Sequence, residues 1–319
     1  MYDVIIVGGG PAGLGAALTL GRARRSTLLL DAGPGRNAPA EAVHNFLGHD
    51  GTPPAELRRI GRAQLAAYPE VEVRDAAAES ARDLGGTGFG LVPAGGGTVQ
   101  GRRLLLATGV RDEIPQVSGL AELWGKSAFH CPYCHGFEVS GKRVAVHGAG
   151  EEHARLALQL RRFSDEVALV TDGVALPDAA AALLAERGVV VRCEAVTRFE
   201  GTGGQLERIA FEGGAALERD AVFVGPVLRQ RSPLAERLGC GLLPGGGVEV
   251  DDFERTTVAG VYAAGDMAHR AALPMPFAAV GPAAASGLVA GAMLDQELLR
   301  AEVGARLSES FKTAAPADA

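Results

Sequence analysis

Short apolar runs separated by glycine-rich turns recur along the N-terminal part of the chain and return near its end. The runs at residues 4–7, 28–30, 104–107 and 261–264 consist of Val, Ile, Leu and Ala with a single Tyr, and they show no polar alternation. Such runs are typical of strands buried on both faces of a parallel sheet. Small and apolar residues at helical spacing follow the first run at 16–20. The pattern predicts alternating strands and helices.

A second set of apolar runs occupies the middle of the chain. Strands are predicted within residues 142–147, 166–171, 189–191 and 221–224, with a helix ending at Leu160. Alternation of strand and helix indicates a doubly wound domain. The two sets together predict the α/β class, with two Rossmann-like nucleotide-binding domains of the three-layer ββα type.

Composition and charge limit the possible partners. The 319 residues are 47% hydrophobic and 22% charged, which suits a globular protein of two domains. A net charge of −7 favours neither nucleic acid nor an anionic membrane. The start of the chain lacks the basic region of a signal peptide, and the run at 278–294 is too rich in Ala and Gly for a membrane span. We expect a cytoplasmic protein without membrane contact.

The first glycine-rich turn has the spacing of a dinucleotide-binding motif. Gly8 permits the tight turn, Gly10 lets the backbone approach a pyrophosphate, and Gly13 lets the helix pack closely on the strand. The helix N-terminus then offers N–H groups to the phosphates. Asp31 ends the second strand, where it is placed to accept a hydrogen bond from a ribose hydroxyl. Strand, turn, helix and acid in register predict a nucleotide site.

The second glycine-rich turn departs from that pattern. Gly148 and Gly150 keep the first two glycines, but His153 takes the third position, and Glu151 and Glu152 lie where phosphate would dock. Carboxylates at a helix N-terminus repel a pyrophosphate. No arginine follows the next strand to take a 2′-phosphate. Gly148 and Gly150 are the candidate NAD(P)H contacts, and this chemistry argues against such binding.

Two cysteines one helical turn apart form the third motif. Cys131 and Cys134 are followed at once by His135. From these residues alone the motif is a redox pair, half of a zinc site, a haem attachment site or an inert pair. Zinc needs further ligands, and Cys193 and Cys240 are isolated, so we expect no metal. Cys193 is expected in the core of a strand, and Cys240 is expected to pack inside.

The order of these motifs resembles the pyridine nucleotide-disulfide oxidoreductase superfamily, in the layout of low-molecular-weight thioredoxin reductases. The finer resemblance is to the FAD-dependent dithiol oxidases of gliotoxin and holomycin type and their bacterial relatives. It covers roughly residues 1–298. The stretches that carry it are residues 44–51, 107–112, 124–125, 129–138, 229–232 and 238–240. Thioredoxin reductases usually have Asp where this chain has His135.

The resemblance implies FAD as the ligand of the first glycine turn. It implies a discontinuous FAD domain of residues 1–114 and 241–303, an NAD(P)-binding-like domain of 115–240 and a disordered tail of 304–319. Residues 274–277 stand where thioredoxin reductases usually carry Arg-Gln. The FAD contacts that it implies are Gly8, Gly10, Pro11, Ala12, Gly13, Asp31, Asn45, Ala107, Thr108, Gly109, Gly265, Asp266, Phe277 and Ala278.

The resemblance also implies roles at the cysteine pair. Cys134 would face the flavin, and Cys131 would exchange with the substrate sulfur. A thiolate is the reactive species, so a neighbouring group must hold the proton. His135, with an ordinary pKa near neutrality, is the first candidate and His130 the second. His44 and His49 lie in a loop that the resemblance places near the flavin or the substrate.

Three functions follow as hypotheses. In the first, a substrate dithiol reduces the Cys131–Cys134 disulfide, FAD takes the electrons, and oxygen or another acceptor receives them. In the second, NAD(P)H or another donor such as ferredoxin drives reduction of thioredoxin. The third is a flavin redox sensor without turnover. The partner is a small dithiol or disulfide, or a thioredoxin-like protein, and the resemblance implies a homodimer.

Overall fold

The computed structural model of the chain describes residues 1–313 and divides them into two compact units. Unit 1 contains residues 1–35, 55–111 and those from 229 onward, and unit 2 contains residues 36–54 and 112–228. Unit 1 is therefore discontinuous in sequence. The boundaries differ from the predicted domain limits: the chain changes unit at 111/112 and 228/229, and residues 36–54 group with the middle of the chain.

Unit 1 is built on a seven-stranded sheet with the order β3-β2-β1-β6-β5-β4, and β18 also pairs with β6. β1 pairs in parallel with β2 and β6, and the β5 pairings are antiparallel. The elements of unit 1 are β1 (Tyr2–Val7), α1 (Pro11–Arg22), β2 (Thr27–Leu30), α2 (Pro54–Leu65), β3 (Val71–Arg74), β4 (Ala78–Asp83), β5 (Phe89–Pro93), β6 (Val99–Leu106), α7 (Leu234–Arg237), β17 (Val248–Glu249), β18 (Val261–Ala263), β19 (Ala268–His269) and α8 (Val280–Thr313).

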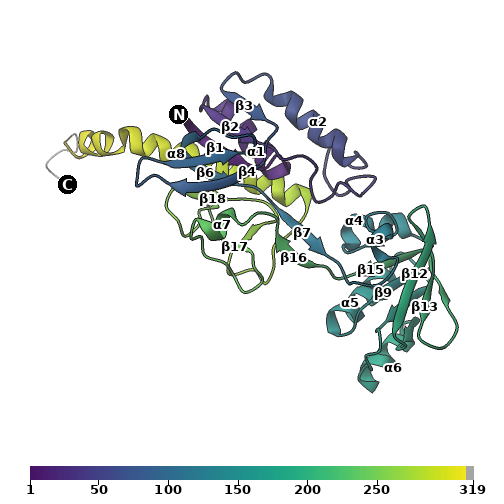
Figure 1. The fold of residues 1–319 in the computed structure, drawn as a ribbon. Helices are drawn as coiled ribbons and strands as arrows, with labels where there is room; N and C mark the ends of the chain where they lie inside the picture. Colours follow the sequence, from purple (N-terminus) through teal and green to yellow (C-terminus); the bar gives the residue numbers. More distant parts are fainter. Residues whose placement is uncertain (314–319) are drawn as a thin grey trace. The chain divides into compact units, whose positions relative to one another are not determined.

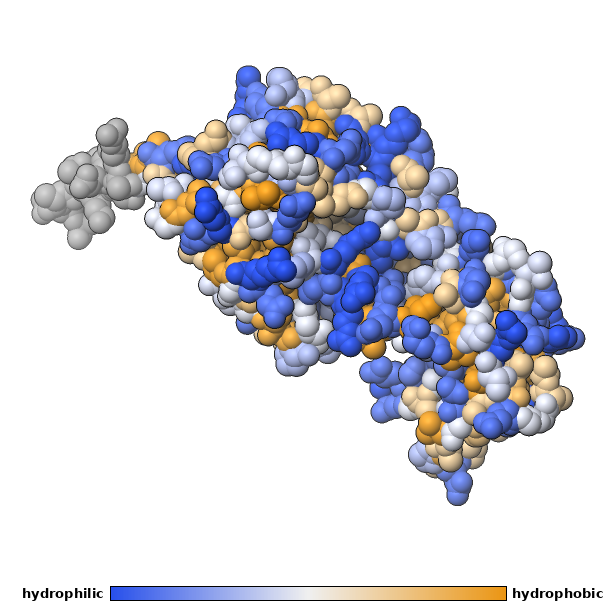
Figure 2. All heavy atoms as spheres, in the orientation of Figure 1, coloured by the Kyte–Doolittle hydropathy of each residue, from blue (hydrophilic) through white to orange (hydrophobic). Residues whose placement is uncertain are grey.

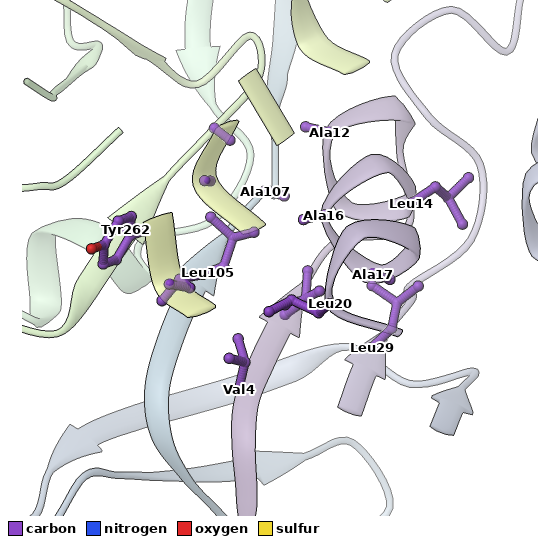
Figure 3. Packing of buried hydrophobic residues seen from close by; sticks show 14 of the residues in the cluster. Val4, Ala12, Leu14, Ala16, Ala17, Leu20, Leu29, Leu105, Ala107 and Tyr262 are labelled. Carbon is purple, nitrogen blue, oxygen red and sulfur yellow. The ribbon is translucent and has the colours of Figure 1, made fainter. Parts of the chain in front are cut away.

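The core of unit 1 lies between the sheet and the helices α1 and α8 (Figure 3). Leu20 of α1 packs with Leu29 and Leu105 of the sheet, and all three are fully buried. Burial of each such side chain stabilises the fold by roughly 1.5–3 kcal/mol. Small residues bring α1 and α8 together, since a Cβ on Gly287 would lie 2.0 Å from the carbonyl oxygen of Ala12. This packing fixes the N-terminus of α1 beside the carboxyl end of β1.

Unit 2 contains a five-stranded parallel sheet with the order β11-β10-β9-β15-β8 and a three-stranded antiparallel sheet, β12-β13-β14. Its elements, of which Figure 1 labels the helices and the strands β9, β12, β13 and β15, are α3 (Leu120–Leu123), β8 (Ala128–Phe129), α4 (Pro132–His135), the 3-10 turn η1 (Phe137–Val139), β9 (Val144–His147), α5 (Glu151–Leu160), β10 (Val167–Val170), α6 (Asp178–Glu186), β11 (Val189–Arg192), β12 (Val196–Thr202), β13 (Gln205–Phe211), β14 (Leu217–Glu218) and β15 (Ala221–Val224). β7 (Val110–Glu113) and β16 (Val227–Gln230) form a further two-stranded sheet where the chain changes unit.

The predicted α/β class is confirmed: the central sheet of each unit is built on parallel strands, and that of unit 1 also carries the antiparallel strands β4 and β5. The expectation for Cys193 was wrong, because it follows the last residue of the edge strand β11 and is exposed. Cys240 is buried, as predicted. The predicted tail begins at residue 304, whereas α8 continues to Thr313; residues 314–319 of that tail lie outside the described residues.

The surface of the molecule and the character of its helices bear on membrane contact. On the face shown in Figure 2, hydrophilic and hydrophobic residues are interspersed. Within residues 1–313, no helix combines the length and the apolar character that crossing a membrane requires.

Candidate active site

The glycine turn after β1 is fixed by close backbone approaches. A Cβ on Gly8 would lie 2.1 Å from the carbonyl oxygen of Ala107, and one on Gly13 would lie 1.8 Å from that of Gly8. Larger residues are therefore excluded at both positions. The structure adds Gly9, whose role the sequence motif had not suggested: a Cβ there would lie 2.2 Å from Cγ of Asp31. The turn is thus held against β6 and the end of β2.

The residues at this turn fit a pyrophosphate. No atom of the described chain lies within 4 Å of the position that a Cβ on Gly10 would take, so this side of the turn is open. Gly10 is the N-cap of α1, and no side chain of residues 1–313 caps the helix. Its first-turn N–H groups are left for a ligand. An open backbone beside an uncapped helix N-terminus is the cradle expected for the FAD phosphates.

Asp31 is buried at the end of β2, and its carboxylate is already engaged. Oδ2 accepts hydrogen bonds from Arg58 at 2.7 Å and Arg62 at 2.9 Å, and Oδ1 accepts one from the N–H of Gly33 at 3.0 Å. The two arginines of α2 had not been anticipated. A ribose hydroxyl would have to share these oxygens, so the predicted ribose contact stays a prediction.

The turns after β6 and β18 meet the glycine turn at the carboxyl ends of these parallel strands. Thr108 approaches Sδ of Met267 through its N–H and its hydroxyl, both at 3.3 Å. A Cβ on Gly265 would lie 3.0 Å from Cβ of Ala12. The structure therefore brings together the predicted contacts within residues 8–13, 107–109 and 265–266.

The remaining predicted FAD contacts are Phe277, Ala278 and Asn45. Phe277 and Ala278 precede α8, and Phe277 is exposed. Phe277 and Gly265 both line a cavity of about 230 Å³ in unit 1, together with Glu254. Burial raises the pKa of Glu254 to about 7. Asn45 belongs to unit 2, where its backbone is left-handed with φ 59°.

The second glycine turn is filled differently from the first. A Cβ on Gly148 would lie 2.3 Å from Nε2 of His153, so the imidazole of His153 lies between α5 and the second glycine turn. In the first turn, Gly13 has no side chain, and α1 packs directly on Gly8. Glu151 and Glu152 form the first turn of α5 and are exposed. These residues do not fit a pyrophosphate, because two carboxylates occupy the helix N-terminus that would bind it.

The cysteine pair lies on α4 in unit 2. Cys131 is the N-cap of this one-turn helix and Cys134 its third residue, and both are half-buried. A hydrogen bond from the Cys134 thiol lowers the pKa of Cys131 to about 7, against the opposing effect of burial. Backbone N–H groups at the start of α4 and the charge of Arg36 act in the same direction as that hydrogen bond. This lowered pKa favours the thiolate form of Cys131 near neutral pH.

His135 follows Cys134 at the end of the same helical turn. Its backbone N–H donates a hydrogen bond to the carbonyl oxygen of Cys131 at 3.2 Å. Its ring stacks on Phe129 with centroids 4.3 Å apart, and its buried Nδ1 has no hydrogen-bond partner among residues 1–313. Burial lowers the pKa of His135 to about 4, which corrects the expected near-neutral value. At neutral pH the ring is therefore neutral, and it can relay a proton but does not hold one.

His130, the other flanking histidine, is held by an ion pair. Arg36 donates to both carboxylate oxygens of Asp112 at 2.7–3.0 Å, and its Nη2 lies 3.2 Å from Nε2 of His130. Trp124 stacks on the His130 ring with centroids 5.9 Å apart. Burial, with a smaller effect from Arg36, lowers the pKa of His130 to about 4. The sequence motif had not pointed to Arg36 or Asp112.

The loop around residues 43–52 also approaches His135 within unit 2. Nε2 of His44 lies 3.4 Å from Oε1 of Glu138, and Nδ1 lies 3.7 Å from Oδ1 of Asp50. The ring of His44 stands edge-on to that of His135 at 6.4 Å. His49 stacks on Phe46 instead. Of the two loop histidines, His44 is the one that lies beside His135.

No group of three or more His, Cys, Asp or Glu side chains in the described part of the chain is arranged to hold a metal ion. The chemistry available at α4 is therefore that of a thiolate, a second thiol and a neutral imidazole. These groups suit thiol–disulfide exchange, in which a thiolate attacks a disulfide and a base relays the displaced proton.

Comparison with known proteins gives consistent matches over nearly the whole chain. The family described as pyridine nucleotide-disulphide oxidoreductase matches residues 2–287. Thioredoxin reductase tcpT of Claviceps purpurea is 35% identical over 94% of this chain and 95% of its own length. An oxidoreductase from Agrobacterium tumefaciens has a TM-score of 0.86 at 37% identity, covering 93% and 98% of the two chains. HlmI has a TM-score of 0.87 at 34% identity, covering 98% of each.

Proposed function

The chain belongs to the pyridine nucleotide-disulphide oxidoreductase family, and from that premise we propose that it is an FAD-dependent dithiol oxidase working through a Cys131–Cys134 disulfide. Residues 8–13, 107–109 and 265–266 would hold the FAD. When bound, FAD supplies a two-electron acceptor that returns the electrons to oxygen or another acceptor.

The residues of unit 2 account for the exchange. A substrate thiolate attacks the sulfur of Cys131, forms a mixed disulfide and displaces the sulfur of Cys134. The second substrate thiol then attacks the substrate sulfur that is bonded to Cys131. This forms the substrate disulfide, displaces the sulfur of Cys131 and leaves the reduced pair. The dithiol loses two protons: one ends on the Cys134 thiol, and the other passes through the neutral ring of His135 to water, because a ring with a pKa of about 4 can relay a proton but does not hold it. The reduced pair ends as a Cys131 thiolate that accepts a hydrogen bond from Cys134, the arrangement described above.

The observation that carries the choice of oxidase over reductase is the second glycine turn. His153 separates α5 from Gly148, and Glu151 and Glu152 oppose a phosphate. The alternative is an NADPH-dependent thioredoxin-disulfide reductase, which the name of the Claviceps purpurea relative favours. A small dithiol as substrate, a cytoplasmic location and a homodimer complete the proposal as predictions from sequence.

Anaerobic stopped-flow mixing distinguishes these functions. The oxidised holoprotein is mixed separately with dithiothreitol, NADPH and NADH, and the flavin absorbance is followed before and after air is admitted. We expect the flavin absorbance to be bleached by dithiothreitol but not by NADPH or NADH, and to recover when air is admitted. Rapid bleaching by NADPH would establish the reductase instead, and a flavin inert to all three would favour a sensor. The Cys134→Ser variant serves as the control and must lose the dithiol-driven bleaching.

A further inference from the structure

The two histidines that flank the cysteine pair have different freedom to exchange protons. The guanidinium of Arg36 carries only donors, so its contact at 3.2 Å requires Nε2 of His130 to be the acceptor. His130 is thereby fixed as the tautomer protonated at Nδ1. His135 instead has a buried Nδ1 without a hydrogen-bond partner among residues 1–313. Of the two flanking histidines, His130 is therefore the one whose tautomer a cation fixes.

The position of Arg36 is itself rigid. Its side chain is 13% exposed and that of Asp112 is 8% exposed, and three hydrogen bonds fix the guanidinium plane on the carboxylate. Such a bidentate pair keeps its geometry better than a flexible ammonium would. The guanidinium then reaches the residue that immediately precedes Cys131. A fixed positive charge beside a sulfur favours the thiolate over the thiol.

We propose, resting on the function proposed above, that Arg36 is a positioning residue of the cysteine pair: it locks His130 as a hydrogen-bond acceptor and stabilises negative charge on the sulfur of Cys131. Asp112 holds the guanidinium in place and sets how much of its charge is neutralised. The other titratable groups around Cys131 are Cys134, His130 and His135, with Glu138 and His44 behind His135. Arg36 is the cation that acts directly on Cys131 among them.

Alkylation of the reduced full-length protein tests this without flavin chemistry, substrate or oxygen. Iodoacetamide reacts with thiolates, and peptide mass spectrometry resolves the rate at Cys131 between about pH 5 and 9. In the wild type we expect a midpoint near pH 7. In Arg36→Gln the rate at pH 7 should fall about three- to fivefold, while Arg36→Lys should recover part of it. Arg198→Gln, at an exposed position of unit 2, is the matched control and should match the wild type.

A second variant keeps the proposal testable if Arg36→Gln does not fold. Asp112→Asn leaves the guanidinium charge less neutralised, so the midpoint for Cys131 should move to lower pH and the rate at pH 6 should rise about twofold. An unchanged midpoint in a folded Arg36→Gln, or a higher midpoint in Asp112→Asn, would overturn the proposal. In ¹⁵N spectra, a His130 ring protonated at Nε2 would also overturn it. A protein that fails the stopped-flow test can still pass these measurements, so the two proposals fail separately.

Discussion

Phe129 and His135 stack with their ring centroids 4.3 Å apart and their planes 14° apart. β8 supplies the phenyl ring and α4 the imidazole. The phenyl ring removes water from one face of the imidazole and offers no hydrogen bond in return. Because burial penalises the charged form, the pair keeps His135 neutral until the pH falls to about 4.

The pH dependence of substrate oxidation should follow from this neutral histidine. A base with a lowered pKa acts above that value and is lost as it becomes protonated. We expect kcat/KM for dithiothreitol oxidation to show no loss from His135 between about pH 5 and 7, and to fall as the pH drops through about 4. His135→Gln should lower kcat/KM about 10²-fold at neutral pH. Because protonation of the dithiothreitol thiol lowers kcat/KM in both proteins, the contribution of His135 is the ratio of wild type to His135→Gln, and a ratio that falls through pH 6.5 would mean that His135 titrates normally.

The hydrogen bond between the two cysteines predicts a difference between two substitutions at one position. A hydroxyl at position 134 can still donate to the Cys131 thiolate, whereas a methyl group cannot. The alkylation midpoint of Cys131 should therefore be higher in Cys134→Ala than in Cys134→Ser, by about one pH unit. Iodoacetamide kinetics on the two reduced proteins measure the difference. Equal midpoints would show that the hydrogen bond does not set the reactivity of Cys131.

Two glycines of the first turn should respond differently to alanine. Gly10 has open space where a Cβ would be, so Gly10→Ala should keep the thermal stability of the flavin-stripped protein but lower its flavin content several-fold. Gly13→Ala forces a clash with the carbonyl oxygen of Gly8 and should lower the stability of the stripped protein by about 1–3 kcal/mol. Denaturant unfolding and the absorbance of released flavin give the two readouts. A Gly10→Ala protein with full flavin content would rule out the open side of this turn as the phosphate cradle.

The second turn should accept a dinucleotide better once its obstacles are removed. Each carboxylate at the start of α5 opposes a phosphate by about 0.3–1 kcal/mol. Glu151→Gln combined with Glu152→Gln should therefore tighten NADPH binding about three- to thirtyfold in titration calorimetry. His153→Ala, added to these, should tighten it further by letting α5 approach Gly148. Glu212→Gln, at an exposed position of unit 2, is the charge-matched control and should leave binding unchanged.

The elements with local signatures were predictable. The strand predicted at residues 4–7 is the buried part of β1, and the one at 221–224 is β15. The order of the motifs also indicated the family, which the comparison confirms. These inferences succeed because a strand, a tight turn and a helix start are each determined within a few residues.

The features that the sequence did not predict depend on contacts between distant parts of the chain. Arg36 and Asp112 are 76 positions apart, and no spacing rule joins them. The low pKa of His135 needs the ring of Phe129, and the exposure of Cys193 follows from the edge position of β11. An edge strand has a neighbouring strand on one side only, so side chains and backbone groups at its other side stay exposed to solvent. The antiparallel sheet β12-β13-β14 was missed because its strands are half-polar and carry no motif.

The stacking of Trp124 on His130 provides an optical reporter. The chain contains a single tryptophan, so its intrinsic fluorescence comes from one indole, and that indole lies against the residue next to Cys131. A protonated imidazole quenches indole emission more strongly than a neutral one. Since His130 becomes charged only near pH 4, the emission should be steady at neutral pH and dim on acidification. In flavin-stripped protein, any change in emission at neutral pH would then follow the arrangement of the cysteine pair itself.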